Sequence, residues 1–127
     1  YEEKVIPKFI KKAINNETIE LHDEGKIIRD FLYIDDLIDA LIILINKGKI
    51  TEVYNIGYDN SISIINLAKM IINMTNSNSD IIFTKNRPYN DYRYYIDNSK
   101  ILELGWKPKY NSENSFKENI KYLINYI

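Results

Sequence analysis

The chain has 127 residues and a formal net charge of −1, from 17 basic and 18 acidic side chains. This length suits one compact domain, and the balanced charge offers no basic surface for a nucleic-acid backbone. With no cysteine and one histidine, the sequence excludes a disulfide framework, a thiol nucleophile and an ordinary catalytic metal site. No apolar run approaches the ~20 residues of a membrane span. We therefore expect a soluble chain with no nucleic-acid, membrane or metal partner.

Residues 1–4 carry neither an initiator methionine nor a signal peptide, so we expect the chain to be part of something longer. The absence of targeting signals and of cysteine predicts a cytoplasmic protein. Isoleucine and asparagine are unusually frequent, which indicates an AT-rich genome; if that genome is viral, the location is the host cytoplasm. Because isoleucine replaces leucine or valine at nearly constant volume, apolar periodicity is a better guide here than residue propensity.

Apolar residues at helical spacing predict an amphipathic helix over residues 5–14, ending near Asn15 and Asn16. Residues 19–22 form a short strand candidate, and the polar residues after them predict a turn. A second extended run follows at 27–34. The two runs predict a β-hairpin.

Asp35 and Asp36 open a predicted helix that continues to about Asn46 and stops at Gly48. Two adjacent carboxylates could form an acid/base site, but helix capping is the better interpretation, because negative charge is favourable at the positive end of the helix dipole. Residues 37–45 are almost all apolar. We therefore expect this helix to be covered on most sides, between a sheet and other helices.

The rest of the chain alternates strands and helices. The patterns predict a strand at 52–57, a helix at 64–75 capped by Ser63, a strand at 80–84, a polar and aromatic loop at 85–95, a short helix at 99–104 stopped by Gly105, a core residue at Trp106, and a last helix capped by Ser112. This order predicts an α/β fold, with a small mixed sheet and packed helices.

Two features of nicotinamide enzymes are missing from the sequence. The four glycines are isolated at positions 25, 48, 57 and 105, so there is no glycine-rich turn to approach a dinucleotide pyrophosphate. None of the eleven tyrosines is followed four residues later by lysine, so the Tyr-x-x-x-Lys proton-transfer pair is absent. We therefore assign no catalytic residue to this chain.

Several motifs nevertheless occur in an order along the chain that indicates a family resemblance. They are Glu3–Phe9 (EKVIPKF), Arg29–Asp36 (RDFLYIDD), Val53–Gly57 (VYNIG) and Asn86–Asp97 (NRPYNDYRYYID), followed by Leu104-Gly105-Trp106. Together they resemble the C-terminal part of the nucleotide-sugar 4,6-dehydratases, which belong to the extended short-chain dehydrogenase/reductase superfamily. The second motif is also similar to sugar epimerases and decarboxylases, whereas the fourth is more typical of the dehydratases.

The resemblance implies that residues 1–127 are a nucleotide-sugar-binding C-terminal domain. In that family the N-terminal Rossmann half, which this chain lacks, binds NAD and catalyses conversion of dTDP- or UDP-glucose to the 4-keto-6-deoxy sugar nucleotide. The full-length enzyme is then expected to be a homodimer formed through its N-terminal half. A 4-epimerase, a decarboxylase, or a stand-alone nucleotide-sugar-binding module remain alternatives.

The resemblance also implies which residues bind substrate: Lys4, Val5, Ile6, Pro7, Glu20, Leu21, His22, Arg29, Asn86, Arg87 and Asn90. Arg29 and Arg87 would hold the diphosphate, since a guanidinium can bind two oxygens at once; a surface ion pair is the alternative for each. Residues 4–9 would border the nucleotide. His22 would lie against the base, where dehydratases of dTDP-sugars usually have tyrosine.

Some positions depart from the family pattern or leave a choice open. Asn86 and Asn90 resemble the plant-type UDP-glucose enzymes, which favours uracil over thymine as the base. Ser61 and Ile64 stand where the family often has glutamate and a nucleotide-binding asparagine, so that contact is lost or replaced. The tyrosines of residues 89–95 could either pack within the loop or stack on a base.

Overall fold

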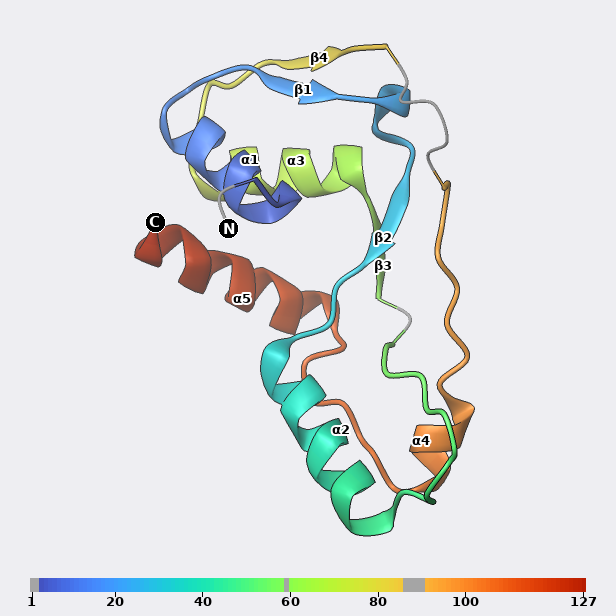
Figure 1. Cartoon of the computed structure of the whole chain (residues 1–127). Coiled ribbons are helices and arrows are strands. Elements are labelled where there is room, and N and C mark those ends of the chain that lie inside the picture. The colour runs from blue at the N-terminus through green and yellow to red at the C-terminus, as the bar shows by residue number, and fades with distance from the viewer. Residues whose placement is uncertain (1–2, 59, 86–90) are drawn as a thin grey trace. The chain divides into compact units, whose positions relative to one another are not determined.

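The computed structural model describes residues 3–58, 60–85 and 91–127 (Figure 1). In these ranges the elements are α1 (Val5–Ile14), β1 (Ile19–Leu21), the 3-10 turn η1 (Asp23–Gly25), β2 (Ile28–Asp30), α2 (Ile34–Lys47), β3 (Ser61–Ser63), α3 (Ile64–Met74), β4 (Ile81–Phe83), α4 (Ser99–Glu103) and α5 (Glu113–Tyr126). The predicted α/β class is confirmed. Among the described residues, no helix has the length and apolar character that crossing a membrane requires.

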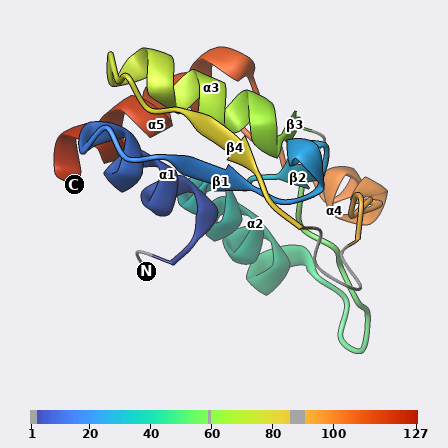
Figure 2. The same ribbon diagram turned by 90° about the horizontal axis from the view of Figure 1, so that it is seen from above.

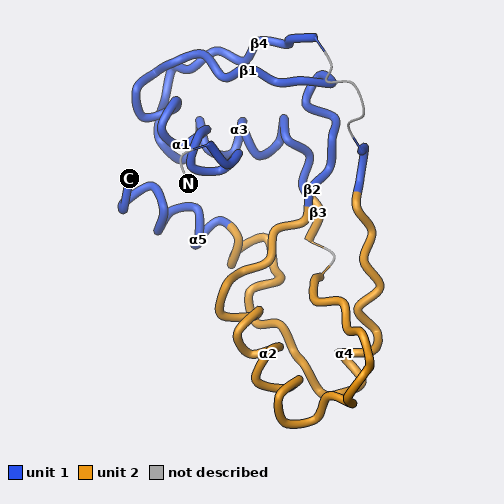
Figure 3. The backbone as a smooth tube through the Cα atoms, viewed as in Figure 1, with its two compact units in different colours: residues 1–29, 62–93, 117–127 blue, residues 30–61, 94–116 orange. Residues whose placement is uncertain are grey.

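The chain divides into two compact units (Figure 3). Unit 1 comprises Tyr1–Arg29, Ile62–Arg93 and Lys117–Ile127, and unit 2 comprises Asp30–Ser61 and Tyr94–Phe116. β2, β3 and α5 each run across the sequence boundary between the units. The candidate site described below lies entirely in unit 1.

Unit 1 is built on a parallel pair of strands, β1 and β4, in which Ile19 is opposite Ile81. The helices α1 and α3 cover one face of this pair (Figures 1 and 2). β1 shows the alternation that such an arrangement requires, because Ile19 and Leu21 are buried and Glu20 between them is exposed. Ile10 of α1 and Leu67 of α3 are fully buried with them. The core of unit 1 therefore lies between the strand pair and these helices.

The predicted hairpin is wrong. β1 pairs with β4, and β2 pairs with β3, so two separate two-stranded pairs replace the expected single mixed sheet. The chain leaves β1 through η1, where Glu24 and Gly25 have positive φ values of 52° and 68°. A Cβ at Gly25 would lie 2.7 Å from the Cβ of Ile65, so this close approach to α3 requires glycine. Parallel pairing of β1 with β4 then buries Ile19 and Leu21 beneath the intervening helices.

Several local signals are confirmed. The Ser63 hydroxyl accepts a hydrogen bond from the Asn66 N–H at 3.3 Å and caps α3. The Ser112 hydroxyl likewise accepts from the Ser115 N–H at 3.1 Å, just before α5. α2 ends at Lys47 with Gly48 as its C-cap. Caps and helix stops act over one turn of chain, so they can be recognised without tertiary information.

Unit 2 has a small core of its own. Ala40, Tyr58, Ile101 and Trp106 are buried together, with Leu32, Ile43, Leu44, Tyr54 and Ile56 packed against them. Trp106 is 1% exposed, as expected for a core residue, and its indole N–H donates to the Asp36 carbonyl at 3.0 Å. The tryptophan follows Gly105, whose φ of +100° allows the chain to leave α4 in the left-handed conformation.

Three expectations for unit 2 are wrong. Within the described ranges, residues 52–57 form no strand, and the apolar helix α2 leaves Ile42 and Ile45 more than half exposed. Capping is also wrong for Asp36: Tyr33 is the N-cap of α2 and makes no side-chain capping bond. The buried Asp36 carboxylate instead accepts N–H groups from residues 109 and 110. It still lies in the first turn of α2, where negative charge is favourable.

Candidate functional site

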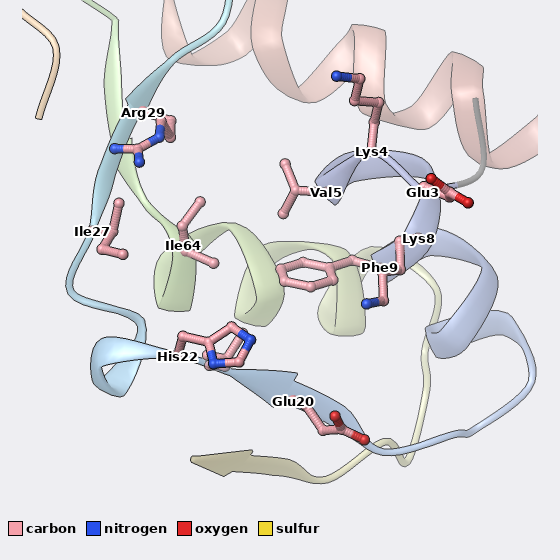
Figure 4. A pocket seen from close by; sticks show the side chains of 11 residues that line it. Glu3, Lys4, Val5, Lys8, Phe9, Glu20, His22, Ile27, Arg29 and Ile64 are labelled. Carbon is pink, nitrogen blue, oxygen red and sulfur yellow. The ribbon is translucent and has the colours of Figure 1, made fainter. Parts of the chain in front are cut away.

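A pocket of about 310 Å³ lies within unit 1 (Figure 4). Its walls come from the start of α1, the end of β1, the strand β2 and the start of α3. The lining residues are Glu3, Lys4, Val5, Lys8, Phe9, Glu20, Leu21, His22, Ile27, Arg29 and Ile64. The packing of α1 and α3 against β1 thus brings together side chains from distant parts of the sequence.

Six of the eleven predicted substrate-binding residues line this pocket: Lys4, Val5, Glu20, Leu21, His22 and Arg29. Ile6 and Pro7 lie in the first turn of α1, but neither belongs to the lining set. Asn86, Arg87 and Asn90 lie outside the described residues. Within the described chain, the prediction therefore selects residues that converge on one cavity.

The charge around the pocket favours an anion. Lys4, Lys8 and Arg29 contribute three positive charges against two negative charges from Glu3 and Glu20. The carboxylate of Glu20 also lies 3.8 Å from the ammonium group of Lys12, which offsets part of its charge.

Two helices begin at the pocket as well. Val5 and Ile64, the first residues of α1 and α3, both belong to its lining. The positive end of each helix dipole therefore faces this region. Helix N-termini with nearby basic side chains are typical phosphate-binding surroundings.

His22 has a fixed orientation. Its Nδ1 atom lies 2.7 Å from the carbonyl oxygen of Lys85 and 3.0 Å from the hydroxyl oxygen of Thr84. Because a carbonyl oxygen can only accept, Nδ1 carries the proton of this hydrogen bond. The opposite edge of the ring, which carries Nε2, faces the pocket (Figure 4). His22 therefore presents a flat ring face and one ring nitrogen to any ligand there.

The opposite wall contains an apolar surface. Val5, Phe9 and Ile64 point into the pocket in Figure 4. Phe9 is 4% exposed, so its ring is held firmly by packing. Together with the His22 ring, these side chains form a slot that suits a planar, weakly polar group.

Arg29 binds the backbone of Asp91 and Tyr92, which belong to the fourth motif. Its Nη1 donates to the backbone carbonyls of Ile28 at 2.7 Å and Asp91 at 3.0 Å, with Tyr92 at 3.5 Å. The Ile28 N–H also donates to the Tyr92 carbonyl at 2.9 Å. Two pocket residues therefore hold backbone on either side of residues 86–90: His22 holds Lys85, and Arg29 holds Asp91.

Sequence reasoning missed part of the apolar lining. Ile27 carries no motif, and it reaches the pocket because the Ile64 N–H donates to its carbonyl at 2.9 Å. Ile64 was predicted as the first residue of the helix capped by Ser63 and as a position that lacks the family's nucleotide-binding asparagine; its place in the apolar lining of the pocket was not predicted. The tyrosines at 92, 94 and 95 are between 54% and 78% exposed, so none of the three is fully buried within the loop.

Comparison with known proteins reveals clear similarity. Residues 1–57 match the NAD dependent epimerase/dehydratase family. The dTDP-D-glucose 4,6-dehydratase of Mus musculus is 39% identical over 129 residues, which cover 96% of this chain and 36% of that protein. A trifunctional UDP-glucose 4,6-dehydratase/UDP-4-keto-6-deoxy-D-glucose 3,5-epimerase/UDP-4-keto-L-rhamnose-reductase of Arabidopsis thaliana is 35% identical over 124 residues, covering 96% of this chain and 19% of the enzyme.

The fold is similar to solved structures over nearly its whole length. The crystal structure of UDP-glucose 4-epimerase with UDP-glucose, from Thermotoga maritima, superposes with a TM-score of 0.85 at 27% identity, covering 99% of this chain and 40% of that one. The resemblance inferred from the motifs is therefore confirmed: the chain is similar to the nucleotide-sugar 4,6-dehydratases of the extended short-chain dehydrogenase/reductase superfamily. It spans at most two fifths of the length of these three proteins.

Proposed function

We propose that this chain is the nucleotide-sugar-binding part of an NAD-dependent 4,6-dehydratase, which converts dTDP- or UDP-glucose to the 4-keto-6-deoxy sugar nucleotide. One observation carries the proposal: six residues that the family resemblance implies, from three separate segments, line the same pocket. The names of the Mus musculus and Arabidopsis thaliana relatives support the reaction.

In this proposal each wall of the pocket has a role. The base packs between the His22 ring and the apolar side chains Val5 and Phe9, where a planar ring is desolvated without losing many hydrogen bonds. The diphosphate lies toward Arg29 and the two helix N-termini, where positive charge is concentrated. Arg87 contributes a second guanidinium; this role rests on the sequence motif alone.

The base that we propose is uracil. Support comes from the sequence Asn-Arg-Pro-Tyr-Asn-Asp at 86–91, which is similar to the plant-type UDP-glucose enzymes, and from histidine at position 22 in place of tyrosine. Binding of UDP and dTDP to the same protein, measured by calorimetry, tests this choice. Tighter binding of dTDP would reverse it.

The residues of this chain do not fit NAD. Among the described residues, one strand leads directly into a helix, where β3 ends at Ser63 and α3 begins at Ile64. This junction contains no glycine, so its backbone cannot approach a pyrophosphate closely. NAD, held elsewhere in the protein, would accept and return the hydride. This chain would bind and orient the sugar nucleotide.

A second candidate is a UDP-glucose 4-epimerase, favoured by the TM-score of 0.85 with the Thermotoga maritima enzyme. The protein expressed from its complete reading frame, incubated with NAD and UDP-glucose, distinguishes the two. A 4-keto product that absorbs in alkali supports dehydration, whereas UDP-galactose supports epimerisation. Binding of UDP-glucose with neither product would indicate a stand-alone binding module.

A further inference from the structure

The lining of the unit 1 pocket contains one side chain of a type that ordinarily changes its charge near neutral pH. Imidazoles usually titrate at about pH 6.5, whereas carboxylates titrate at about pH 4 and lysines at about pH 10. Besides His22, the charged residues of the described lining are carboxylates, lysines and an arginine. The charge of this pocket can therefore respond to pH through His22.

The hydrogen bonds of His22 hold its ring in the same orientation in both protonation states. Its Nδ1 donates to the Lys85 carbonyl at 2.7 Å, and the Thr84 hydroxyl oxygen lies 3.0 Å from the same atom. That hydroxyl donates its own proton to the Leu21 carbonyl at 3.4 Å, so its oxygen can also accept from Nδ1. A second proton therefore enters at Nε2, on the edge that faces the pocket (Figure 4). Protonation adds a positive charge there without turning the ring.

The charges of the empty pocket oppose this second proton. Apart from His22, three lining residues are positive and two are negative, namely Lys4, Lys8 and Arg29 against Glu3 and Glu20. A surplus of like charge disfavours a further cation. Glu20 is two residues from His22 along the chain and would favour the proton, but its carboxylate lies 3.8 Å from the ammonium group of Lys12 and shares its charge with it.

The remaining charged residues of the adjoining segments lie outside the lining. They are Lys11 of α1, Asp23 and Glu24 of η1, Lys26 after it, Lys69 of α3 and Lys85 after β4. Glu24 and Lys26 form an ion pair with each other, and the Lys85 side chain is exposed to water. Exposed charges are screened by solvent, so the lining residues dominate the field at His22.

A nucleoside diphosphate sugar reverses the charge balance of the pocket. Both of its phosphates are esterified, so it carries two negative charges throughout the neutral range and lacks the phosphate proton that titrates at about pH 6 in a terminal phosphate. With His22 uncharged, such a ligand changes the lining from a surplus of one positive charge to a surplus of one negative charge. An opposite charge nearby favours the protonated form of an imidazole.

We propose that His22 takes up a proton when a nucleoside diphosphate sugar enters the pocket, and that this ligand binds more tightly as pH falls from about 8 to about 6. The sign follows from linkage: the bound protein holds more protons than the empty protein, so a lower pH favours the bound state. The inference rests on the proposed function, which assigns this class of ligand to the pocket. His22 thus makes substrate affinity sensitive to pH.

Calorimetry on the protein from its complete reading frame tests the proposal. The probe is UDP methylated on its terminal phosphate, which keeps two constant charges and has no sugar to react. We expect its dissociation constant to be about 2–6-fold lower at about pH 6 than at about pH 8. In buffers of different ionisation enthalpy, binding at about pH 7 should take up roughly 0.25–0.5 proton per ligand. Unchanged affinity without proton uptake would overturn the proposal.

Two variants separate His22 from other titrating groups in the protein. His22→Tyr keeps an aromatic ring, and His22→Asn keeps a donor for the Lys85 carbonyl, but neither new side chain titrates between about pH 6 and 8. Both should lose the proton uptake and bind the ester equally at the two pH values. Lys69→Ala, an exposed change outside the lining, should keep the wild-type response. A response that persists in both His22 variants would overturn the proposal.

Nitrogen NMR of the labelled histidine ring identifies the site of the proton directly. The His22 signals are those that disappear in His22→Asn. At about pH 7 the methyl ester should increase the protonated fraction at Nε2, while Nδ1 stays protonated in both states. Uridine, which lacks the diphosphate, should leave the signals of Nε2 in the same protonation state as in the empty protein. An equal response to uridine would overturn coupling through the charge of the ligand.

The outcome is separable from that of the proposed function. A protein that forms the 4-keto product, but binds the methyl ester with no proton uptake at His22, would overturn this inference alone. A protein that takes up the proton with the ester, but converts no nucleotide sugar, would overturn the proposed function and support this inference.

Discussion

The buried carboxylate of Asp36 accepts a hydrogen bond from the backbone N–H of Tyr110 at 3.0 Å, although 74 residues separate them. The other carboxylate oxygen accepts the N–H of Lys109 at 2.8 Å. The Asp36 carbonyl also accepts the indole N–H of Trp106. One residue at the start of α2 therefore fixes the chain between α4 and α5 within unit 2.

Removal of this carboxylate should be costly. We expect Asp36→Ala to lower the free energy of unfolding by about 2–4 kcal/mol, because it leaves two partly buried N–H groups without an acceptor. Urea denaturation followed by circular dichroism measures the change.

Asp35 provides the matched control. It lies in the same turn of α2 and carries the same charge, but it is exposed. Asp35→Ala should change the free energy of unfolding by less than about 0.5 kcal/mol. If both variants lower the free energy of unfolding equally, the stabilisation comes from negative charge near the helix dipole and not from the hydrogen bonds to residues 109 and 110.

Tyr58 should make unit 2 sensitive to alkali. Burial raises the pKa of the Tyr58 phenol above its usual value of 10, and its hydroxyl accepts the Tyr33 N–H at 3.0 Å. Because the folded pKa is the higher one, the stabilisation is complete below pH 10 and is lost as pH rises through the folded pKa. Tyr58→Phe should cost about 1–2 kcal/mol near neutral pH and lose less stability than wild type above pH 10.

Urea titrations at several pH values between about 8 and 11 measure this slope. Tyr126→Phe is the control, since Tyr126 is 80% exposed. It should keep the wild-type slope. A Tyr58→Phe variant with the same alkaline loss as wild type would show that other groups control the transition.

What could be predicted from sequence was local. The Ser63 and Ser112 caps and the stop at Gly48 depend on residues within one turn, and all three are confirmed. The pairing of β1 with β4 could not be predicted, because alternation identifies a strand but not its partner. The bonding of the Asp36 carboxylate to residues 73 and 74 positions away could not be predicted either, because a carboxylate at a helix start can bond to its own turn or to a distant part of the chain.

The candidate site was predictable only through resemblance. Lys4 and Arg29 belong to the motifs, His22 was implied by the family resemblance outside them, and all three line the pocket. Ile27 lines it too, yet an isoleucine in an isoleucine-rich chain carries no signal of its own. The anchoring of Lys85 by His22 and of Asp91 by Arg29 depends on tertiary structure, so no motif could reveal it.

One side of α2 exposes a stripe of apolar side chains, namely Ile34, Ile38, Leu41, Ile42 and Ile45. This stripe should cause the isolated 127-residue chain to self-associate. Apolar side chains such as Ile45, which is 83% exposed, gain by leaving water wherever another apolar surface is available. We expect sedimentation to show oligomers that Ile45→Lys reduces and Ile50→Lys, off the stripe, does not. A sharp two-state melt of a monomeric wild-type chain would contradict this expectation.

Loss of the His22 ring should weaken binding of UDP. The ring faces the pocket and stacking of a base on an aromatic ring contributes about 1–3 kcal/mol, so His22→Ala should raise the dissociation constant accordingly in the protein from its complete reading frame. Lys26→Ala, an exposed change in the next turn, should have no effect. If calorimetry shows the same affinity for UDP in His22→Ala as in wild type, the base does not contact the His22 ring.

Arg87 is predicted from the motif to bind the diphosphate, and its loss should be felt specifically by ligands that carry that group. Arg87→Ala, in the protein from its complete reading frame, should weaken binding of UDP-glucose by about 1.5–3 kcal/mol, the range for a hydrogen bond to a charged group. Uridine, which has no phosphate, should bind wild type and variant equally. Lys49→Ala removes an exposed positive charge from unit 2 and should leave both affinities unchanged, because surface charge alone contributes little. Equal affinity of wild type and Arg87→Ala for UDP-glucose would exclude Arg87 from the site, since an arginine that touches a diphosphate cannot be removed without leaving its charge unpaired.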